Sequence, residues 1–283
     1  MTGKILTVLI LFGATNSFAG VFQIKTKEVL KRELGSRVMK LSDWVEKTND
    51  EGFDMLCLGE SHIKFYRNFY AEKVLSKIKL NTLALESQQD VAVQIHANYV
   101  ELRDDGVDVT GVAINPVTEA VYAVNPDAKV YGVEKTQKEG GLITFARLDQ
   151  LSGKKSDDII SRDGFIAEHV DSLLEEGTGR VAALYGSKHC AKYATKGFGY
   201  EIPFYRQLMD KYGDTKKMVA VHIITSDKRS NPLRAYADDF GFLSEGEDIV
   251  VVNPGEIAPK NYNYHRSLMN IFQTYDVVIL TSK

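Results

Sequence analysis

Phe53-Asp54-Met55-Leu56-Cys57-Leu58-Gly59-Glu60-Ser61-His62 is a short apolar run that leads directly into Gly-Glu-Ser-His. The pattern returns later in the chain as Val181-Ala182-Ala183-Leu184-Tyr185-Gly186-Ser187-Lys188-His189. Apolar runs of this length predict buried strands, and a glycine at a strand end allows a sharp turn. Polar side chains that follow such strands lie where open α/β sheets bind ligands. The two copies therefore predict two halves that converge on one site.

Strand-like and helix-like segments alternate along the chain. We expect strands at residues 55–58, 82–85, 129–133, 180–185, 218–224, 249–252 and 277–280. We expect helices at residues 23–34, 65–77, 90–104, 157–176, 204–212 and 264–273. This alternation predicts an α/β fold with a mostly parallel central sheet and helices on both faces. Since no Pro/Ser-rich linker interrupts it, residues 20–283 are expected to form one domain.

A weak internal duplication supports the idea of two related halves. Phe69-Tyr70, a helix and a strand that leads to Glu86 follow the first glycine motif. Phe204-Tyr205, a helix and a strand that contains His222 follow the second. Glu86 and His222 would then occupy corresponding places in the two halves.

The amino terminus has the pattern of a secretory signal peptide. Lys4 precedes an apolar run at residues 5–12, and Ser17-Phe18-Ala19 places small residues before a cleavage site at Gly20. The run is too short to span a bilayer. The sequence thus predicts a signal peptide at residues 1–19 and a periplasmic or extracellular mature protein without a membrane anchor.

Composition narrows the function classes. The chain is 44% hydrophobic and 26% charged, which is typical of a soluble globular protein. Its formal net charge of -3 argues against nucleic acid as a partner, because phosphate recognition requires an excess of Lys and Arg.

The two cysteines, Cys57 and Cys190, each flank a glycine motif. An oxidising compartment would permit a disulfide between them. A disulfide requires Cα atoms within about 7 Å of each other, which the sequence does not establish. We therefore expect two buried free thiols rather than a bridge.

Several titratable side chains are placed at predicted strand ends, namely Glu60, His62, Glu86, Glu134 and His189. Carboxylates and imidazoles gathered at one edge can act as general acid and base on a bound water. They can also hold a divalent metal that activates the water. The sequence leaves both roles open, with Glu60, His62, Glu86 and His189 as a mixed oxygen and nitrogen ligand set suited to Mn, Co or Zn.

Arg162 opens a predicted helix, where its guanidinium can clamp a carboxylate or stabilise an oxyanion. It can equally form a surface pair with Glu168 or Asp158. His96, His169 and His265 fall within predicted helices and are expected to be surface or core histidines. Common signatures are missing from the sequence: no Gly-x-Ser-x-Gly elbow and no His-Glu-x-x-His occurs.

The order of these motifs resembles the erythromycin esterase, ChaN and TraB–Tiki superfamily. The resemblance rests on Gly59-Glu60-Ser61-His62, Leu83-Ala84-Leu85-Glu86, Arg162, Gly186-Ser187-Lys188-His189 and the closing run Tyr275-Asp276-Val277-Val278-Ile279-Leu280. It implies an α/β fold with a shared cleft, in a family whose members hydrolyse a cyclic ester, cleave peptides with a metal, or bind haem. Carried over by position, Glu60, His62, Glu86, Arg162 and His189 would form the site. Lys188 departs from the pattern, and it would either lower the pKa of His189 or point to solvent.

Our leading hypothesis from the sequence is an exported hydrolase that acts on an ester or peptide bond of a small-molecule or peptide substrate. Glu60 or His62 would activate water, His189 would orient or protonate, and Arg162 with Glu86 would position the substrate carbonyl. One alternative is a module of the ChaN type that binds haem or another flat cofactor, suggested by the family likeness and by the 14 Tyr. Another is a secreted effector or toxin-like enzyme.

Overall fold

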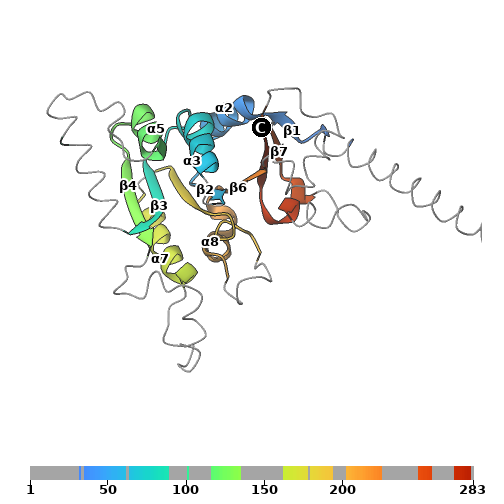
Figure 1. Cartoon of the computed structure of the whole chain (residues 1–283). Coiled ribbons are helices and arrows are strands. Elements are labelled where there is room, and N and C mark those ends of the chain that lie inside the picture. The colour runs from blue at the N-terminus through green and yellow to red at the C-terminus, as the bar shows by residue number, and fades with distance from the viewer. Residues whose placement is uncertain are drawn as a thin grey trace, which may run out of the picture.

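The computed structural model describes residues 32, 35–61, 64–88, 101, 116–134, 162–177, 179–193, 202–224, 248–256 and 271–281. These residues contain one eight-stranded sheet in the order β1-β7-β8-β6-β2-β5-β3-β4 (Figure 1). In that order the strands are β1 (Val38–Lys40), β7 (Ile249–Val252), β8 (Val277–Leu280), β6 (Met218–Ile224), β2 (Met55–Glu60), β5 (Val181–Gly186), β3 (Thr82–Gln88) and β4 (Lys129–Glu134). All neighbours from β8 to β4 are parallel, whereas β7 is antiparallel to both β1 and β8.

Helices cover both faces of the sheet. One face carries α2 (Leu41–Glu51), α3 (Lys64–Tyr70), the π-helical turn η1 (Ala71–Leu75) and α5 (Pro116–Val124). The other carries α7 (Arg162–Glu175) and α8 (Phe204–Tyr212), as Figure 1 shows. Because successive strand residues point to opposite faces, β2 supplies Met55 and Cys57 to the α7 and α8 side and Leu56 and Leu58 to the α2, α3 and α5 side. The predicted α/β fold with a mostly parallel sheet is confirmed.

The seven predicted strands are all present, and those at 218–224, 249–252 and 277–280 have the predicted bounds. The predicted helix at 65–77 is divided into α3 and η1, and the one at 157–176 is described from Arg162 to Glu175 as α7. Among the described strands and α-helices, β1, α2 and α5 were not predicted. β1 has three residues, and α2 buries only Leu41, Trp44 and Val45, so neither carries a strong periodic signal. The predicted helices at 23–34 and 90–104 lie almost entirely outside the described residues.

The order of the strands has an approximate twofold pattern. β2 and β5 pair at the centre, and each is followed by a helix and then by a strand that lies beyond the other, β3 beside β5 and β6 beside β2. The helices that follow them, α3 and α8, lie on opposite faces. This arrangement agrees with the two related halves suggested by the sequence, and Glu86 and His222 are each the fifth residue of their strand.

The two glycine motifs touch at the carboxyl edge of the sheet. A Cβ on Gly59 would lie 3.0 Å from the Cα of Ser187 and 3.1 Å from the carbonyl oxygen of Val221. The backbone N–H of Ser187 donates to the carbonyl of Glu60 over 2.7 Å. Gly59 is therefore a glycine because the second motif packs directly on it.

A disulfide joins Cys57 to Cys190, so the expectation of two free thiols was wrong. Cys57 lies on β2, and Cys190 is the last residue of the turn after β5. Because β2 and β5 are neighbours, this turn brings the two Cα atoms to 5.5 Å, within bridging distance. The bond attaches the loop that carries His189 to the centre of the sheet.

Replacing both cysteines, Cys57→Ala/Cys190→Ala, is expected to lower the free energy of unfolding by up to about 5 kcal/mol, because the bridge closes a loop between residues 133 positions apart. Urea unfolding of the wild type with and without dithiothreitol, beside the variant, measures this. Reducing agent should lower the stability of the wild type and leave the variant unchanged. Equal unfolding free energies in all samples would show that the bridge does not form.

Candidate active site

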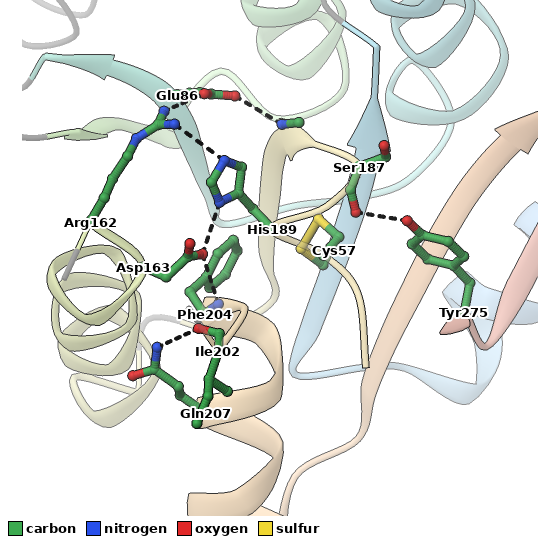
Figure 2. A network of polar contacts seen from close by, with 12 residues as sticks. Cys57, Glu86, Arg162, Asp163, Ser187, His189, Ile202, Phe204, Gln207 and Tyr275 are labelled. Carbon is green, nitrogen blue, oxygen red and sulfur yellow. Dashed lines mark hydrogen bonds and ion pairs between the residues drawn. A yellow bond between two sulfur atoms is a disulfide. The ribbon is translucent and has the colours of Figure 1, made fainter. Parts of the chain in front are cut away.

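Four side chains form one connected chain of polar contacts at the carboxyl edge of the sheet (Figure 2). Glu86 accepts an ion-paired hydrogen bond from Nη2 of Arg162, and Nη1 of Arg162 lies 3.2 Å from Nε2 of His189. Nδ1 of His189 lies 2.8 Å from Oδ1 of Asp163. The contacts thus run from Glu86 through Arg162 and His189 to Asp163, and Figure 2 shows the Arg162 guanidinium between the carboxylate and the imidazole.

Backbone groups hold both carboxylates in place. The N–H of Gly186 donates to Glu86 over 2.8 Å, so the second glycine motif fixes this carboxylate near the carboxyl end of β3. The N–H of Phe204 donates to Oδ1 of Asp163 over 2.9 Å, which ties the beginning of α7 to the beginning of α8. Since both acids are bonded on two sides, their positions are set by the sheet and the helices rather than by the ligand.

The partners of His189 determine which ring nitrogen carries the proton. A guanidinium only donates hydrogen bonds, so Nε2 must accept from Arg162. Nδ1 then carries the hydrogen and donates it to Asp163. With these partners the imidazole is in its neutral Nδ1–H form, and the lone pair of Nε2 faces Nη1 of Arg162.

The pKa of His189 is raised above its ordinary value of 6.5. Burial lowers it and the nearby Arg162 charge also lowers it, but the hydrogen bond and charge of Asp163, together with Glu86, outweigh both. Lys188 is an exposed residue directly before His189, and Asp163, Arg162 and Glu86 are the charged groups named here that act on the pKa of His189. A histidine tuned upward from 6.5 can exchange a proton near neutral pH.

The side chain of Glu60 points to the face of the sheet opposite α7 and α8. It follows Leu56 and Leu58 on the face covered by α3, and it forms a two-point ion pair with Arg67 of that helix. Nε of Arg67 lies 3.0 and 3.2 Å from the two carboxylate oxygens of Glu60, and Nη2 lies 2.9 Å from the first. His62 lies outside the described residues, as does the side chain of Glu134. The structure therefore brings Glu86, Arg162 and His189 together and places Glu60 beside Arg67.

His222 lies on β6, where it pairs with Gly59 of β2 in the sheet. Its ring stacks on Tyr275 with centroids 4.6 Å apart, and Tyr275 donates its hydroxyl to the carbonyl of Ser187. Burial lowers the pKa of His222 to about 4, and its Nδ1 has no hydrogen-bond partner in the described part of the chain. His222 is a weak base at neutral pH for this reason, so it does not share the properties of His189.

The predicted metal ligands do not assemble among the residues that the structure describes. Within those ranges no three His, Cys, Asp or Glu side chains are grouped so that they could hold a metal ion. The place between Glu86 and His189 holds the positive charge of Arg162, and Glu60 faces Arg67. Of the four side chains considered as metal ligands, Glu60 and Glu86 are thus bound by guanidinium groups, and His62 lies outside the described residues.

Four buried tyrosines use their hydroxyls within the chain. Tyr70 donates to the carbonyl of Gly59, Tyr185 to Leu85, Tyr205 to Asp276 and Tyr275 to Ser187. Burial raises the pKa of Tyr70 and Tyr205 well above 10 and that of Tyr275 to about 12. A phenolate that could ligate haem iron is therefore disfavoured at these three residues.

No protein-family model matches the chain, and no curated protein matches it in sequence. Among solved structures, a mutant of the erythromycin esterase EreC in its open conformation aligns with a TM-score of 0.50 at 10% identity, covering 86% of this chain and 94% of that one. The fold is similar to that of an erythromycin esterase. The resemblance expected from the sequence is confirmed at the level of the fold.

Two further solved structures align with lower scores. The haem-binding protein ChaN of Campylobacter jejuni has a TM-score of 0.43 at 12% identity, covering 87% of this chain and 96% of that one. A protein from Bacillus cereus has a TM-score of 0.48 at 10% identity, covering 90% of this chain and 97% of that one.

Among the described residues, no helix is both long enough and apolar enough to cross a membrane.

Asp163 and Arg67 were not among the predicted site residues. Asp163 directly follows Arg162 at the beginning of α7, and that adjacency is the one sequence signal that could have drawn attention to it. Arg67 lies seven positions after Glu60 and returns to it because α3 folds back over the end of β2. No regular spacing rule relates a strand end to a residue in the next helix, so the pair becomes visible only in the fold.

Replacing Asp163 by Asn is expected to lower the pKa of His189, because the carboxylate charge is removed while an oxygen remains to accept from Nδ1 and from Phe204. A titration of the imidazole signals by NMR measures the change. In the wild type the folded pKa exceeds the unfolded value of 6.5, so the pair adds stability below that pH and loses this contribution as the pH rises through the folded pKa.

Asp171→Asn is the matched control, because Asp171 lies on the same helix but pairs with Lys211. This variant should leave the pKa of His189 unchanged. A His189 pKa that is equal in the wild type and in Asp163→Asn would contradict the pairing.

Proposed function

We propose that this chain is an exported hydrolase that cleaves an ester or peptide bond, with His189 as its general base and acid. The observation that carries the proposal is the contact chain from Asp163 through His189 and Arg162 to Glu86. It joins an oriented imidazole to a cationic hydrogen-bond donor at the edge where α/β sheets bind substrates. The fold similarity to an esterase agrees with it.

In the proposed reaction, a water molecule attacks the carbonyl carbon while Nε2 of His189 takes its proton. Asp163 holds the Nδ1–H tautomer and stabilises the imidazolium that forms. The collapse of the tetrahedral intermediate breaks the bond to the leaving group, and Nε2 returns the proton to the leaving oxygen or nitrogen. The products are a carboxylic acid and an alcohol or amine, so atoms and charge balance.

Arg162 has the position required to stabilise the oxyanion. Its guanidinium lies 3.2 Å from Nε2 of His189, so the carbonyl oxygen and the attacking water can lie side by side. When substrate binds, the N–H group that now faces Nε2 donates to the carbonyl oxygen instead and leaves the lone pair of Nε2 to the water. Glu86 keeps the guanidinium in place by accepting a hydrogen bond from Nη2 of Arg162. A donor that is fixed before the reaction costs no reorganisation when the charge develops.

Glu60 and His62 keep a supporting part in the proposal. Glu60 is bound by Arg67 and almost completely buried, so it is less suited than His189 to take a proton from water. It holds Arg67 at the same edge of the sheet. His62 comes two residues after the last residue of β2 in the sequence, and we assign it to substrate contact.

The Cys57–Cys190 bridge supports export. Disulfides form and persist in oxidising compartments and are rare where thiols are kept reduced. The chain also begins with the pattern of a signal peptide, so the mature protein would start at Gly20 in the periplasm or outside the cell.

Replacing His189 by Ala is expected to lower kcat/KM for hydrolysis of p-nitrophenyl esters by about 10²- to 10⁴-fold, the usual size of a general-base effect. Arg162→Gln should lower kcat by about 10²- to 10³-fold with a smaller change in KM, because the lost interaction forms mainly in the transition state. Initial rates on purified residues 20–283 measure both.

His169→Ala and Arg206→Gln are the matched controls. His169 is an exposed histidine on α7, and Arg206 forms a surface pair with Asp210 on α8. Both variants should retain wild-type rates. Full activity in His189→Ala would refute the mechanism, and a haemin Soret band that His189→Ala abolishes, in a protein without esterase activity, would favour the haem-binding alternative.

A further inference from the structure

At the carboxyl edge of the sheet, carboxylates form an inner layer and guanidinium groups form an outer layer. The side chains of Glu60 and Glu86 are 2% and 14% exposed, whereas those of their partners Arg67 and Arg162 are both 43% exposed. The negative groups therefore lie inside the protein, and the positive groups face the solvent.

Each buried carboxylate already has its donors. Glu60 accepts from Nε and Nη2 of Arg67, and Glu86 accepts from Arg162 and from the backbone of Gly186. A ligand that approaches this edge therefore meets N–H groups before it meets carboxylate oxygens. Such a surface attracts anions and repels cations.

Arg67 has donors left for a ligand. Its guanidinium binds Glu60 along the Nε and Nη2 edge, which leaves Nη1 on the opposite side. Within the described part of the chain, Nη1 has no hydrogen-bond partner. The pKa of Arg67 is raised, chiefly by its hydrogen bond to Glu60, and the charge of Glu86 also contributes. Glu60, the partner of Arg67, pairs with Gly186 in the β2–β5 register, and the N–H of Gly186 donates to Glu86, the partner of Arg162. Arg67 therefore lies at the same edge of the sheet as Arg162.

The guanidinium of Arg67 is therefore a donor whose orientation is fixed before any ligand arrives. The planar fork of Arg suits the oxygens of carboxylate and phosphate, which accept two parallel hydrogen bonds. The side chain of Arg67 is partly exposed, so its free edge can donate to a ligand while the other edge stays bound to Glu60.

We infer that Arg67 binds an anionic group of the substrate, a carboxylate or a phosphate, next to the bond that Arg162 and His189 act on. The inference rests on the proposed function for the identity of the neighbouring bond. It adds a substrate class to that function, namely esters or amides that carry a negative charge. Arg67 is then a specificity residue, while Arg162 serves the reacting carbonyl.

Two esters that differ in charge test this assignment. p-Nitrophenyl butyrate is neutral, and mono-p-nitrophenyl succinate has a similar length and one free carboxylate. The wild type should prefer the charged ester by at least about tenfold in kcat/KM, the usual gain from one charged hydrogen bond. Arg67→Gln should abolish that preference, and Arg67→Lys should keep part of it because a point charge replaces the fork.

Arg206→Gln is the matched control, since it removes a surface arginine from α8, and it should keep the wild-type preference. A ratio of rates that is the same in the wild type and in Arg67→Gln would overturn the inference. Arg67→Gln leaves the buried carboxylate of Glu60 without its arginine. The double variant Glu60→Gln/Arg67→Gln therefore serves as a second sample, because it contains no unpaired carboxylate at this position.

Binding without turnover separates the inference from the proposed function. Isothermal titration of His189→Ala with succinate, and separately with inorganic phosphate, should show binding that the added Glu60→Gln/Arg67→Gln changes abolish. Binding of succinate alone would identify a carboxylate site, and binding of phosphate a phosphate site. Anion binding in a protein that hydrolyses no ester would refute the hydrolase and keep the anion site. Hydrolysis of the neutral ester with no binding of either anion would refute the anion site alone.

Discussion

The parallel pairing of β2 with β5 at the centre of the sheet is the constraint on which the rest of the structure depends. It places the ends of both apolar runs at one edge, and it makes Ser187 pack on Gly59. It also brings Cys190 to Cys57, so a covalent bond holds the turn that presents His189. The β3 neighbour of β5 then adds Glu86 to the same edge. Every residue of the candidate site is held by an element that borders this pair.

Charge pairing across the sheet edge determines what the site can do. Three carboxylates lie in the interior, and each is bound to a cation or an imidazole: Glu60 to Arg67, Glu86 to Arg162 and Asp163 to His189. Leaving any of them buried without its partner would cost free energy, so each pair fixes the position of its partner. The result is a neutral, oriented imidazole with a guanidinium beside it. The same pairing leaves no group of free carboxylates for a metal among the described residues.

Sequence patterns predicted the sheet well because its strands are continuous apolar runs bounded by polar residues. They also predicted that Glu86 and His189 lie at strand ends, and their contact through Arg162 follows from the β3–β5 pairing. Asp163, Arg67 and the disulfide were missed for one physical reason: each depends on a contact between elements distant in the chain or between a strand and a helix that folds back. Alternation within a segment says nothing about such contacts. Glu60 ends β2 at the same edge, and strand alternation directs its side chain to the α3 side, where it pairs with Arg67.

In the proposed reaction His189 takes the proton from water. The most direct test is the pH dependence of kcat/KM for ester hydrolysis by the wild type, measured in the buffer used for the NMR titration of His189. The account predicts a rate that rises with pH through one ionisation above 6.5, at the pKa that NMR gives for His189. A rate that instead rises through an ionisation near 4, in the range of a carboxylate, would contradict it and make a glutamate the base.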